Sequence, residues 1–353
     1  MTFCVMIMGG AFGQRAARLP WRPGRAIMAA TEGPPGVGAV NLGNQAQGGE
    51  RSGMSPTTGE GSAGGRPPSG VSRRRFLSWV LGAGLALGAA ASATAGYALV
   101  LEPGWLQVKR VPVVLPGLPP ALDGLSIAHL TDLHWGRYTG LREIRAAVDA
   151  ANALEPDLVV LTGDYVLGSA AYAEPCGAEL AALRAPLGVY AVAGNHDYWT
   201  DITTVGGALA AAGLPLMRNE ARRLEVAGSV LWLAGLDDVY EGHDDLESAL
   251  APVPPGEPVL LLVHEPDFAV RAALAPWSIL LQLSGHSHGG QVCLPFVGPP
   301  ILPWLGRIYP AGLQAVAGAS LQVYTNRGVG VTSPPVRLNC RPEVALLTLQ
   351  AAG

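Results

Sequence analysis

Five apolar runs in the chain are each followed at once by side chains that can bind metal ions. In chain order these side chains are Asp132 and His134, then Asp164, then Asn195, His196 and Asp197, then His264, and last His286 and His288. Imidazole, carboxylate and carboxamide groups together suit Mn, Fe or Zn, whereas Ca and Mg sites favour oxygen ligands alone. So many candidates exceed the needs of one tetrahedral ion, but they suit two divalent ions about 4 Å apart that share a carboxylate. The residues therefore predict a two-metal centre.

The apolar runs before these side chains have the length and composition of buried strands. They cover residues 125–130, 158–161, 189–192, 259–263 and 279–283. Helical patterns are predicted over 140–153, over 176–184 and near 204–212, a hairpin over 224–233, and closing strands over 315–316, 321–324 and 345–349. Strands that alternate with helices indicate an α/β fold. Because ligands bind at the carboxyl ends of strands in such sheets, we expect all five segments to meet at one edge.

These motifs resemble, in order and type, those of the calcineurin-like metallophosphoesterase family. The matching segments are Asp132-Leu133-His134, Gly163-Asp164, Gly194-Asn195-His196-Asp197, His264 and Gly285-His286-Ser287-His288. The resemblance covers about residues 124–350 and implies a β-sandwich flanked by helices, an αββα arrangement within the α/β class. Each motif alone is common, but all five in order are specific.

The C-terminal part carries three further motifs that are similar to one branch of that family. They are Gly289-Gly290-Gln291-Val292, Asn326-Arg327-Gly328 and Cys340-Arg341-Pro342-Glu343. The branch contains bacterial membrane-associated or twin-arginine-exported phosphoesterases, some of them linked to phosphodiester or UDP-2,3-diacylglucosamine pyrophosphate hydrolysis.

The resemblance implies a role for each residue of the site. The metal ligands would be Asp132, His134 and His288 for the first ion, Asn195, His264 and His286 for the second, and Asp164 as the bridge. His196 would not bind metal but would donate a proton to the leaving oxygen, and Asp197 would orient His196. No motif position is missing, so the resemblance implies an active enzyme.

The implied activity is the hydrolysis of a phosphoric ester, either a phosphodiester or a pyrophosphate. Two divalent ions lower the pKa of a bridging water, and the resulting hydroxide attacks phosphorus while the ions offset the developing charge. A neutral Asn195 leaves the cluster more positive than a carboxylate would, which favours an anionic substrate. The alternatives are a non-catalytic phosphoesterase-fold binding protein, a mononuclear metal hydrolase, or specifically a lipid-linked UDP-diacylglucosamine hydrolase.

Some residues near the motifs have a structural interpretation beside a functional one. His129 lies within the first strand and is predicted to be structural, and His243 is predicted to lie in a solvated loop. Tyr198 and Trp199 either form an apolar wall beside the substrate or pack. Asp237 and Asp238 either line the pocket or form a solvated turn.

Three features of the C-terminal half remain. Arg327 either contacts a phosphate or pairs with an acid, and the Asn-Arg-Gly context favours the site. Residues 295–303 with Trp304 form an apolar, turn-rich stretch, for which a packed surface loop is favoured over a lid or a segment that dips toward lipid. The cysteines beyond residue 101 are expected to be buried thiols; they are Cys176, Cys293 and Cys340.

The N-terminal third has the composition of a targeting segment rather than of a folded domain. Residues 1–71 are expected to be disordered, because positions 29–70 hold almost no large apolar side chains. Residues 72–101 begin with Ser-Arg-Arg-Arg-Phe-Leu and continue uncharged from residue 76, long enough to cross a bilayer. They resemble a twin-arginine signal, either cleaved near Ala95 or kept as an anchor, and imply the twin-arginine export machinery as a partner. Residues 102–123 are predicted to be a linker with a first strand.

The charge of the chain is distributed unevenly. Residues 1–75 carry nine Arg and three Glu, whereas the remainder carries 14 Lys and Arg against 24 Asp and Glu. An acidic body argues against nucleic acid as a partner. With basic residues on the cytoplasmic side, the body is expected outside the cytoplasmic membrane, or secreted if the signal is cleaved. Because export signals rarely follow a long leader, Met54 is an alternative start.

Overall fold

The computed structural model describes residues 71–352. The segment predicted to be disordered, apart from its last residue, and the alternative start at Met54 lie outside the described residues. Within the described part, strands and helices alternate along the chain as the apolar runs predicted.

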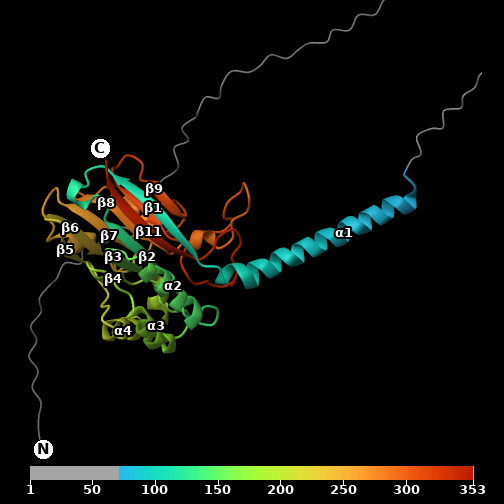
Figure 1. Ribbon diagram of the computed structural model, residues 1–353, viewed down its shortest axis with the longest axis horizontal. Helices are drawn as coiled ribbons and strands as arrows, with labels where there is room; N and C mark the ends of the chain where they lie inside the picture. The colour runs from blue at the N-terminus through green and yellow to red at the C-terminus, as the bar shows by residue number, and fades with distance from the viewer. Residues whose placement is uncertain (1–70, 353) are drawn as a thin grey trace, which may run out of the picture. The chain divides into compact units, whose positions relative to one another are not determined.

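Two β-sheets form the body (Figure 1). The first has the order β1-β11-β2-β3-β4, and the second the order β5-β6-β7-β8-β10-β9. The strands of the first sheet are β1 (Gln107–Leu115), β11 (Glu343–Ala351), β2 (Ser126–Leu130), β3 (Leu158–Thr162) and β4 (Val189–Val192). Those of the second are β5 (Glu220–Val226), β6 (Ser229–Gly235), β7 (Pro258–Leu262), β8 (Ser278–Ser284), β10 (Gln322–Thr325) and β9 (Gly312–Ala315).

The central strands of each sheet are buried on both faces, whereas the edge strands β1 and β5 leave alternate residues exposed. Ile127 of β2 packs between the sheets with Leu260 of β7, while Ala128 and Leu130 of β2 pack on the opposite side. On that outer side lie α2 (Leu141–Ala153), α3 (Ala173–Leu180) and α4 (Asn195–Ala211). The short helices α5 (Leu246–Leu250) and α6 (Ala269–Ala272) cover the outer face of the second sheet. The αββα expectation is therefore confirmed.

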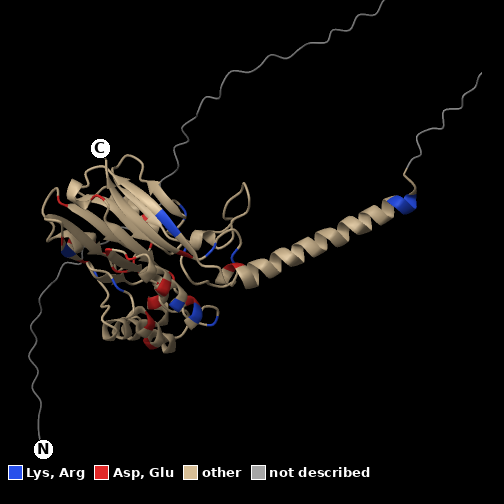
Figure 2. Ribbon diagram, in the orientation of Figure 1, with Lys and Arg blue, Asp and Glu red and all other residues tan. Residues whose placement is uncertain are grey.

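One described helix, α1 (Arg73–Gly96), is long and apolar enough to cross a membrane by length and composition. None of its residues is buried, and its charges are confined to the arginines of its first turn (Figure 2). Three cations at a helix N-terminus oppose the helix dipole. Their placement therefore does not stabilise the helix.

The C-terminal end of α1 is joined to the body by hydrogen bonds. The helix continues through a π-helical turn, Tyr97–Leu101, and a 3-10 turn, Glu102–Gly104. The buried Glu102 carboxylate accepts the N–H groups of Asn339 at 3.0 Å and Cys340 at 2.6 Å. The N–H of Arg337 donates to the Ala98 carbonyl at 3.0 Å. Beyond this junction the predicted first strand, β1, pairs in parallel with β11.

Candidate metal centre

The side chains of the five motifs converge where the carboxyl ends of strands from both sheets meet. Strands β2, β3 and β4 of the first sheet and β7 and β8 of the second each lead into one motif. We expected one edge of one sheet; the site instead lies at the ends of two facing sheets. The seven predicted ligands, which are Asp132, His134, Asp164, Asn195, His264, His286 and His288, are all buried there.

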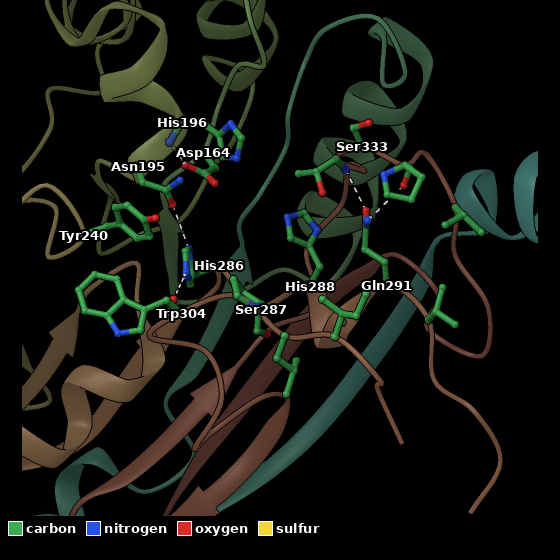
Figure 3. A pocket seen from close by; sticks show the side chains of 18 of the residues that line it. Asp164, Asn195, His196, Tyr240, His286, Ser287, His288, Gln291, Trp304 and Ser333 are labelled. Atoms are coloured by element: carbon green, nitrogen blue, oxygen red, sulfur yellow. Dashed lines mark hydrogen bonds between the residues drawn. The ribbon is translucent and has the colours of Figure 1, made fainter. Parts of the chain in front are cut away.

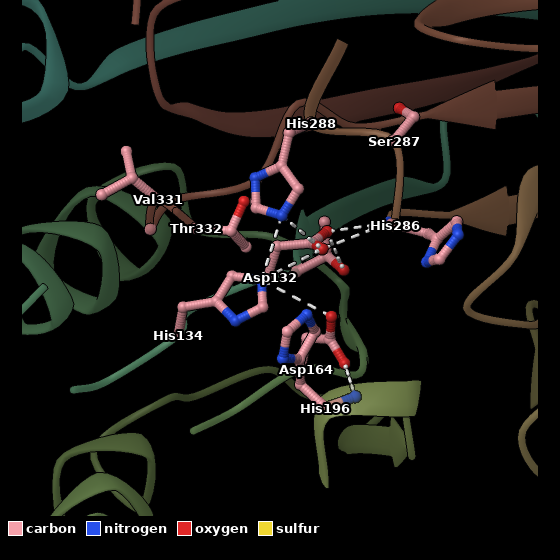
Figure 4. A network of polar contacts seen from close by, with 12 residues as sticks. Asp132, His134, Asp164, His196, His286, Ser287, His288, Val331 and Thr332 are labelled. Carbon is pink, nitrogen blue, oxygen red and sulfur yellow. Dashed lines mark hydrogen bonds and ion pairs between the residues drawn. The ribbon is translucent and has the colours of Figure 1, made fainter. Parts of the chain in front are cut away.

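The first group of side chains is compact (Figure 4). The Nε2 atom of His288 lies 3.0 Å from Nε2 of His134 and 3.2 Å from Oδ1 of Asp132. The His134 Nε2 and Asp132 Oδ1 atoms are 3.7 Å apart. Ligand bonds of about 2.1 Å give edges of about 3.0–3.5 Å between neighbouring ligands in octahedral or tetrahedral geometry. Two of the three separations fall in this range and the third exceeds it by 0.2 Å, so a small shift of these side chains would give the ligand shell of one ion.

Asp164 stands between this group and a second one. Its Oδ2 atom is 3.5 Å from Nε2 of His134 and 3.1 Å from Nε2 of His264. Its Oδ1 atom accepts the N–H of His196 at 2.8 Å. One carboxylate oxygen thus faces an imidazole of each group, which is the placement that a bridging ligand requires.

The second group consists of Asn195, His264 and His286. Nδ1 of His286 lies 2.9 Å from Oδ1 of Asn195, and its Nε2 lies 2.7 Å from the Trp304 carbonyl (Figure 3). Nδ1 of His264 lies 2.6 Å from the Thr162 carbonyl. Since a carbonyl only accepts, it fixes the proton of each ring on the facing nitrogen.

These tautomers provide a test of whether the residues fit a metal. With its proton on Nε2 beside the Trp304 carbonyl, His286 directs the lone pair of Nδ1 at the Asn195 oxygen, itself an acceptor. Acceptors that face each other in a buried site repel, and a cation between them removes the repulsion. Nε2 of His264 faces the Asp164 carboxylate at 3.1 Å, where it donates when protonated and offers a lone pair to an ion when it is not. The second group therefore fits a divalent ion.

The pKa values of the cluster reflect the same environment. Burial lowers the pKa of His134 and of His286, each to about 4. Burial alone would raise the pKa of Asp132, but neighbouring histidines hold it well below its usual value. Burial alone would lower the pKa of His264, but the Asp164 and Asp132 carboxylates raise it well above its usual value. Ionised carboxylates next to two neutral imidazoles are the state that metal binding needs.

The backbone at the site is strained in a way the sequence did not indicate. Five of the seven predicted ligands have a positive φ, between 45° and 66°; they are Asp132, His134, Asp164, His286 and His288. Non-glycine residues rarely adopt this conformation, and its cost is on the order of 1–3 kcal/mol each. Such strain concentrates at functional sites, which supports a functional role for the cluster.

Two glycines of the motifs, Gly194 and Gly285, allow the backbone to approach the carboxylates closely. A Cβ atom on Gly194 would lie 2.4 Å from Oδ1 of Asp164, and one on Gly285 would lie 2.2 Å from Oδ2 of Asp132. Neither distance is sterically possible, so only glycine leaves room for both side chains.

His196 and Asp197 occupy the first turn of α4, which begins at Asn195 rather than near residue 204 as predicted. The His196 ring lines the cavity, with its centroid 4.7 Å from that of His134 and 4.6 Å from a ring of Trp199.

The contacts of Asp197 differ from the expectation that this residue orients His196. Its carboxylate accepts the N–H groups of Asp164 at 2.9 Å, Tyr165 at 2.8 Å and Gly194 at 3.0 Å. It therefore organises the turns that carry the ligands, and burial with the Asp164 charge raises its pKa to about 8.

A cavity of about 480 Å³ opens over the site. Four of the seven predicted ligands line it, and so do Trp199, Tyr240 and Trp304, which places Trp199 in the pocket wall; the four ligands are Asp164, Asn195, His286 and His288. The remaining wall comes from residues 300–303 and 332–336 (Figure 3). The sequence analysis did not single out Tyr240 or residues 332–336. Their types carry no chemical signature, and only the fold brings them to the ligands.

The remaining candidates lie outside the cavity. His129 is buried with Nε2 2.8 Å from Oγ1 of Thr162, a structural contact as predicted. The exposed His243 ring stacks on Tyr198. Asp237 accepts hydrogen bonds from Tyr198 and Arg218, and neither Asp237 nor Asp238 lines the cavity.

Arg327 is not among the residues that line the cavity, nor does it form an ion pair with an acid among the described residues, so its role stays a prediction. Two expectations are corrected. Cys293 is only half buried, whereas Cys176 and Cys340 are buried, and all three are free thiols. Residues 295–303 do not pack as expected, since the side chain of Phe296 is 109% exposed and that of Ile301 is 79% exposed.

Two facing sheets between helices, with an Asp and His cluster at the strand ends, define the class of two-layered metal-dependent hydrolases. Residues 125–290 match the Calcineurin-like phosphoesterase family. The chain is 36% identical over 288 residues to the uncharacterized metallophosphoesterase YkuE of Bacillus subtilis, covering 99% of that protein and 80% of this chain. It is 33% identical over 286 residues to phosphodiesterase YaeI of Escherichia coli, covering 99% of that protein and 79% of this chain.

A bovine transmembrane protein with a metallophosphoesterase domain is 36% identical over 259 residues, which cover 69% of this chain and 57% of the bovine protein. The chain belongs to the calcineurin-like metallophosphoesterase family. It is therefore a hydrolase of a family that uses divalent metal ions. The chain has one candidate membrane helix among its described residues, and the bovine relative is named a transmembrane protein.

Proposed function

We propose that this chain hydrolyses phosphodiesters or pyrophosphates with two divalent ions bound at the cluster. The observation that supports this most directly is Asp164, whose Oδ2 atom lies 3.5 Å from His134 Nε2 and 3.1 Å from His264 Nε2. The first ion is assigned to Asp132, His134 and His288, and the second to Asn195, His264 and His286, with Asp164 shared. When bound, the two ions supply a lowered pKa for a water molecule and positive charge for phosphate oxygens.

The chain's own residues divide the remaining work. His196 lines the cavity from the first turn of α4. Its backbone N–H donates to Oδ1 of Asp164, which fixes its position relative to the ligands. We assign to its ring the role of general acid, which donates a proton to the leaving oxygen. The Asp197 carboxylate holds the turns around Gly194 and Asp164, and so it keeps His196 at a fixed position relative to the ligands. The neutral Asn195 favours a substrate with negative charge.

The cavity wall favours a diester or a pyrophosphate over a simple monoester. The rings of Trp199, Tyr240 and Trp304 pack in sequence along the wall, with centroids 5.4 Å and 5.3 Å apart, and Leu302 and Pro303 also line the cavity. An apolar wall can bind the second substituent of a diester, which a monoester such as a small sugar phosphate lacks. A lipid-linked nucleotide sugar of the UDP-diacylglucosamine type belongs to the same class and is our second candidate.

We further propose that α1 anchors the protein, with residues 1–71 cytoplasmic and residues 124–350 as the phosphoesterase domain outside the cytoplasmic membrane. The Ser72-Arg73-Arg74 start of α1 supports the twin-arginine machinery as the export route. The buried Glu102, bonded to Asn339 and Cys340, supports an end of α1 that stays with the body. N-terminal sequencing of the membrane fraction tests this: a mature chain that begins beyond Ala95 would show that α1 is removed.

The activity is tested by a screen of phosphate monoesters, diesters and nucleotide-sugar pyrophosphates with added Mn, Fe or Zn. We expect turnover of diesters or pyrophosphates, and loss of that turnover in Asp164→Asn. A protein that binds two ions per chain and turns over none of these substrates would instead support the non-catalytic binding protein. One ion per chain in an active protein would support the mononuclear hydrolase.

A further inference from the structure

Residues 292–308, which we call the apolar loop, expose large hydrophobic side chains next to the cavity. The exposed fractions are 109% for Phe296, 73% for Val297, 79% for Ile301, 50% for Trp304 and 57% for Ile308. Scattered single hydrophobic residues are normal on a surface, but a cluster within one loop marks an interaction site. Among the described residues, Trp304 is partly covered by Tyr240, whereas Phe296, Val297 and Ile301 are left largely open to solvent.

The position of the apolar loop relates it to α1. At its base, Cys293 N–H donates to the Leu338 carbonyl at 2.8 Å, and Leu338 N–H donates to the Gln291 carbonyl at 2.9 Å. The same segment, residues 337–340, holds the end of α1 through Ala98 and Glu102. Hydrogen-bonded backbones lie about 5 Å apart, so the base of the loop is on the order of 10 Å from the end of α1.

The charge around the apolar loop fits a lipid surface. The body is acidic, yet residues 268–342, which contain the loop, hold no Asp or Glu and five Arg, of which Arg337 is buried and Arg271 pairs with Asp244. The carboxylate that contacts the loop is that of Asp267, which accepts the backbone N–H groups of Arg307 and Ile308 at 2.9 Å each. Arg307 is the single charged residue of the loop, and it is exposed. Beside the end of α1, the Arg341 guanidinium lies 3.7 Å from the ring centroid of the half-exposed Trp105. Trp with Arg is typical of a membrane interface, where anionic headgroups attract cations and repel carboxylates.

We propose that the apolar loop rests on the bilayer that α1 enters and forms a second membrane contact. Phe296, Val297 and Ile308 would lie at the headgroup and acyl boundary, with Arg307 at the phosphates. This inference rests on the membrane placement of α1 proposed above. Ile301 and Trp304 belong both to the loop and to the cavity wall. The cavity would therefore open at the lipid surface and receive its phosphoester from there.

The test uses the full chain in phospholipid nanodiscs, with photoreactive benzoylphenylalanine in place of one residue at a time. Phe296 reports on the apolar loop, and Leu87 of α1, which is 72% exposed, reports on membrane insertion. Val114 is the matched control, because it is 48% exposed but lies seven residues along β1 from Gln107. That spacing is about 23 Å of extended strand. A thermal unfolding curve for each protein verifies that it is folded.

We expect lipid adducts at Leu87 and Phe296 and at least tenfold fewer at Val114. Adducts at Leu87 without adducts at Phe296 would overturn the loop contact and leave α1 in the membrane. Absence of adducts at both positions would overturn the membrane placement itself. Equal labelling at Val114 and Phe296, or a chain-to-chain product at Phe296, would also overturn the proposal, the latter in favour of a second copy. None of these readouts depends on hydrolysis.

Discussion

The Nε2 atoms of His134 and His288 lie 3.0 Å apart, although 154 residues separate the two histidines in the sequence. Both rings are buried, and neither Nδ1 atom has a hydrogen-bond partner within the described residues. Two imidazoles in this arrangement cannot both be protonated without strong repulsion. A neutral pair shares one proton as an N–H···N hydrogen bond, and an ion bound by both Nε2 lone pairs would replace that bond. The fold therefore brings two metal-capable nitrogens to the spacing that one cation needs.

Removal of the metal should consequently destabilise the protein as well as inactivate it. A ligand present at about 100-fold above its Kd stabilises the folded state by about 2.7 kcal/mol. We expect chelation to abolish hydrolysis and to lower the Tm by about 5 °C or more. Both should return when Mn, Fe or Zn is added. Differential scanning calorimetry with metal analysis by mass spectrometry is the measurement, and an unchanged Tm after complete metal loss would contradict the fit of these residues to ions.

Asp164 should affect both ions at once, because a single oxygen faces both groups. Asp164→Asn keeps the shape of the side chain but removes its charge. We expect metal content to fall from two ions per chain to fewer than one, with loss of hydrolysis. Asp149→Asn is the matched control, since Asp149 is exposed on α2 and should retain two ions. If only one ion is lost from Asp164→Asn, the shared position is wrong.

The strands and the ligands were accessible from the sequence for a common reason. Strands buried on both faces are continuous apolar runs, and the polar residues that end them are conspicuous, so β2, β3, β4, β7 and β8 were all predicted. The start of α4 was missed because its first turn is polar, so the apolar period that reveals a helix begins later. Its N-terminus is specified by the Gly194 and Asp197 backbone contacts, which only the fold displays.

Other parts of the site depend on tertiary context. The positive φ values of Asp132 and His286 cannot be inferred from residue types that ordinarily avoid that region. Tyr240 enters the wall from a turn that no motif marks. Residues 295–303 were expected to pack because apolar residues usually do in water. Several of their side chains are exposed instead, which fits the lipid contact proposed above, and composition alone does not distinguish a packed loop from an exposed one.

His196 should matter for the rate and not for the metals. His196→Ala leaves the seven predicted ligands intact, so we expect two ions per chain. Hydrolysis of an alkyl phosphodiester should fall by about 100-fold or more, the usual range for loss of a general acid. A p-nitrophenyl diester, whose leaving group needs less protonation, should lose less. His243→Ala is the control, because His243 is exposed and outside the cavity. Equal losses for the two substrates would contradict the proton-donor role.

Gly194 should not tolerate a methyl group. A Cβ there would meet Oδ1 of Asp164 at 2.4 Å and Cε1 of His264 at 2.9 Å. We expect Gly194→Ala to displace ligands of both groups, with a stability loss of about 1–3 kcal/mol and weakened metal binding in titrations. Gly207→Ala is the control in the same helix, because nothing lies within 4 Å of its Cβ position. It should raise stability by up to about 1 kcal/mol. Equal stability and metal affinity for the two variants would show that the close approach is relaxed in solution.

Asp197 should act on the ligands through the backbone. Its carboxylate satisfies three buried N–H groups, so Asp197→Ala leaves them without partners, at a cost of about 1–3 kcal/mol for each unsatisfied group. Asp197→Asn keeps one acceptor oxygen and should lose less. Asp149→Ala, on the exposed face of α2, should change stability by less than about 0.5 kcal/mol. Chemical denaturation of the metal-loaded proteins measures the free energy of unfolding of each variant.

If Asp197 instead oriented the His196 ring, Asp197→Ala would keep its stability. Its hydrolysis rate would fall, and the fall would depend on the leaving group as it does for His196→Ala. The hydrogen bonds to Gly194, Asp164 and Tyr165 predict the opposite, a fall in stability and metal affinity with the same loss for both diesters.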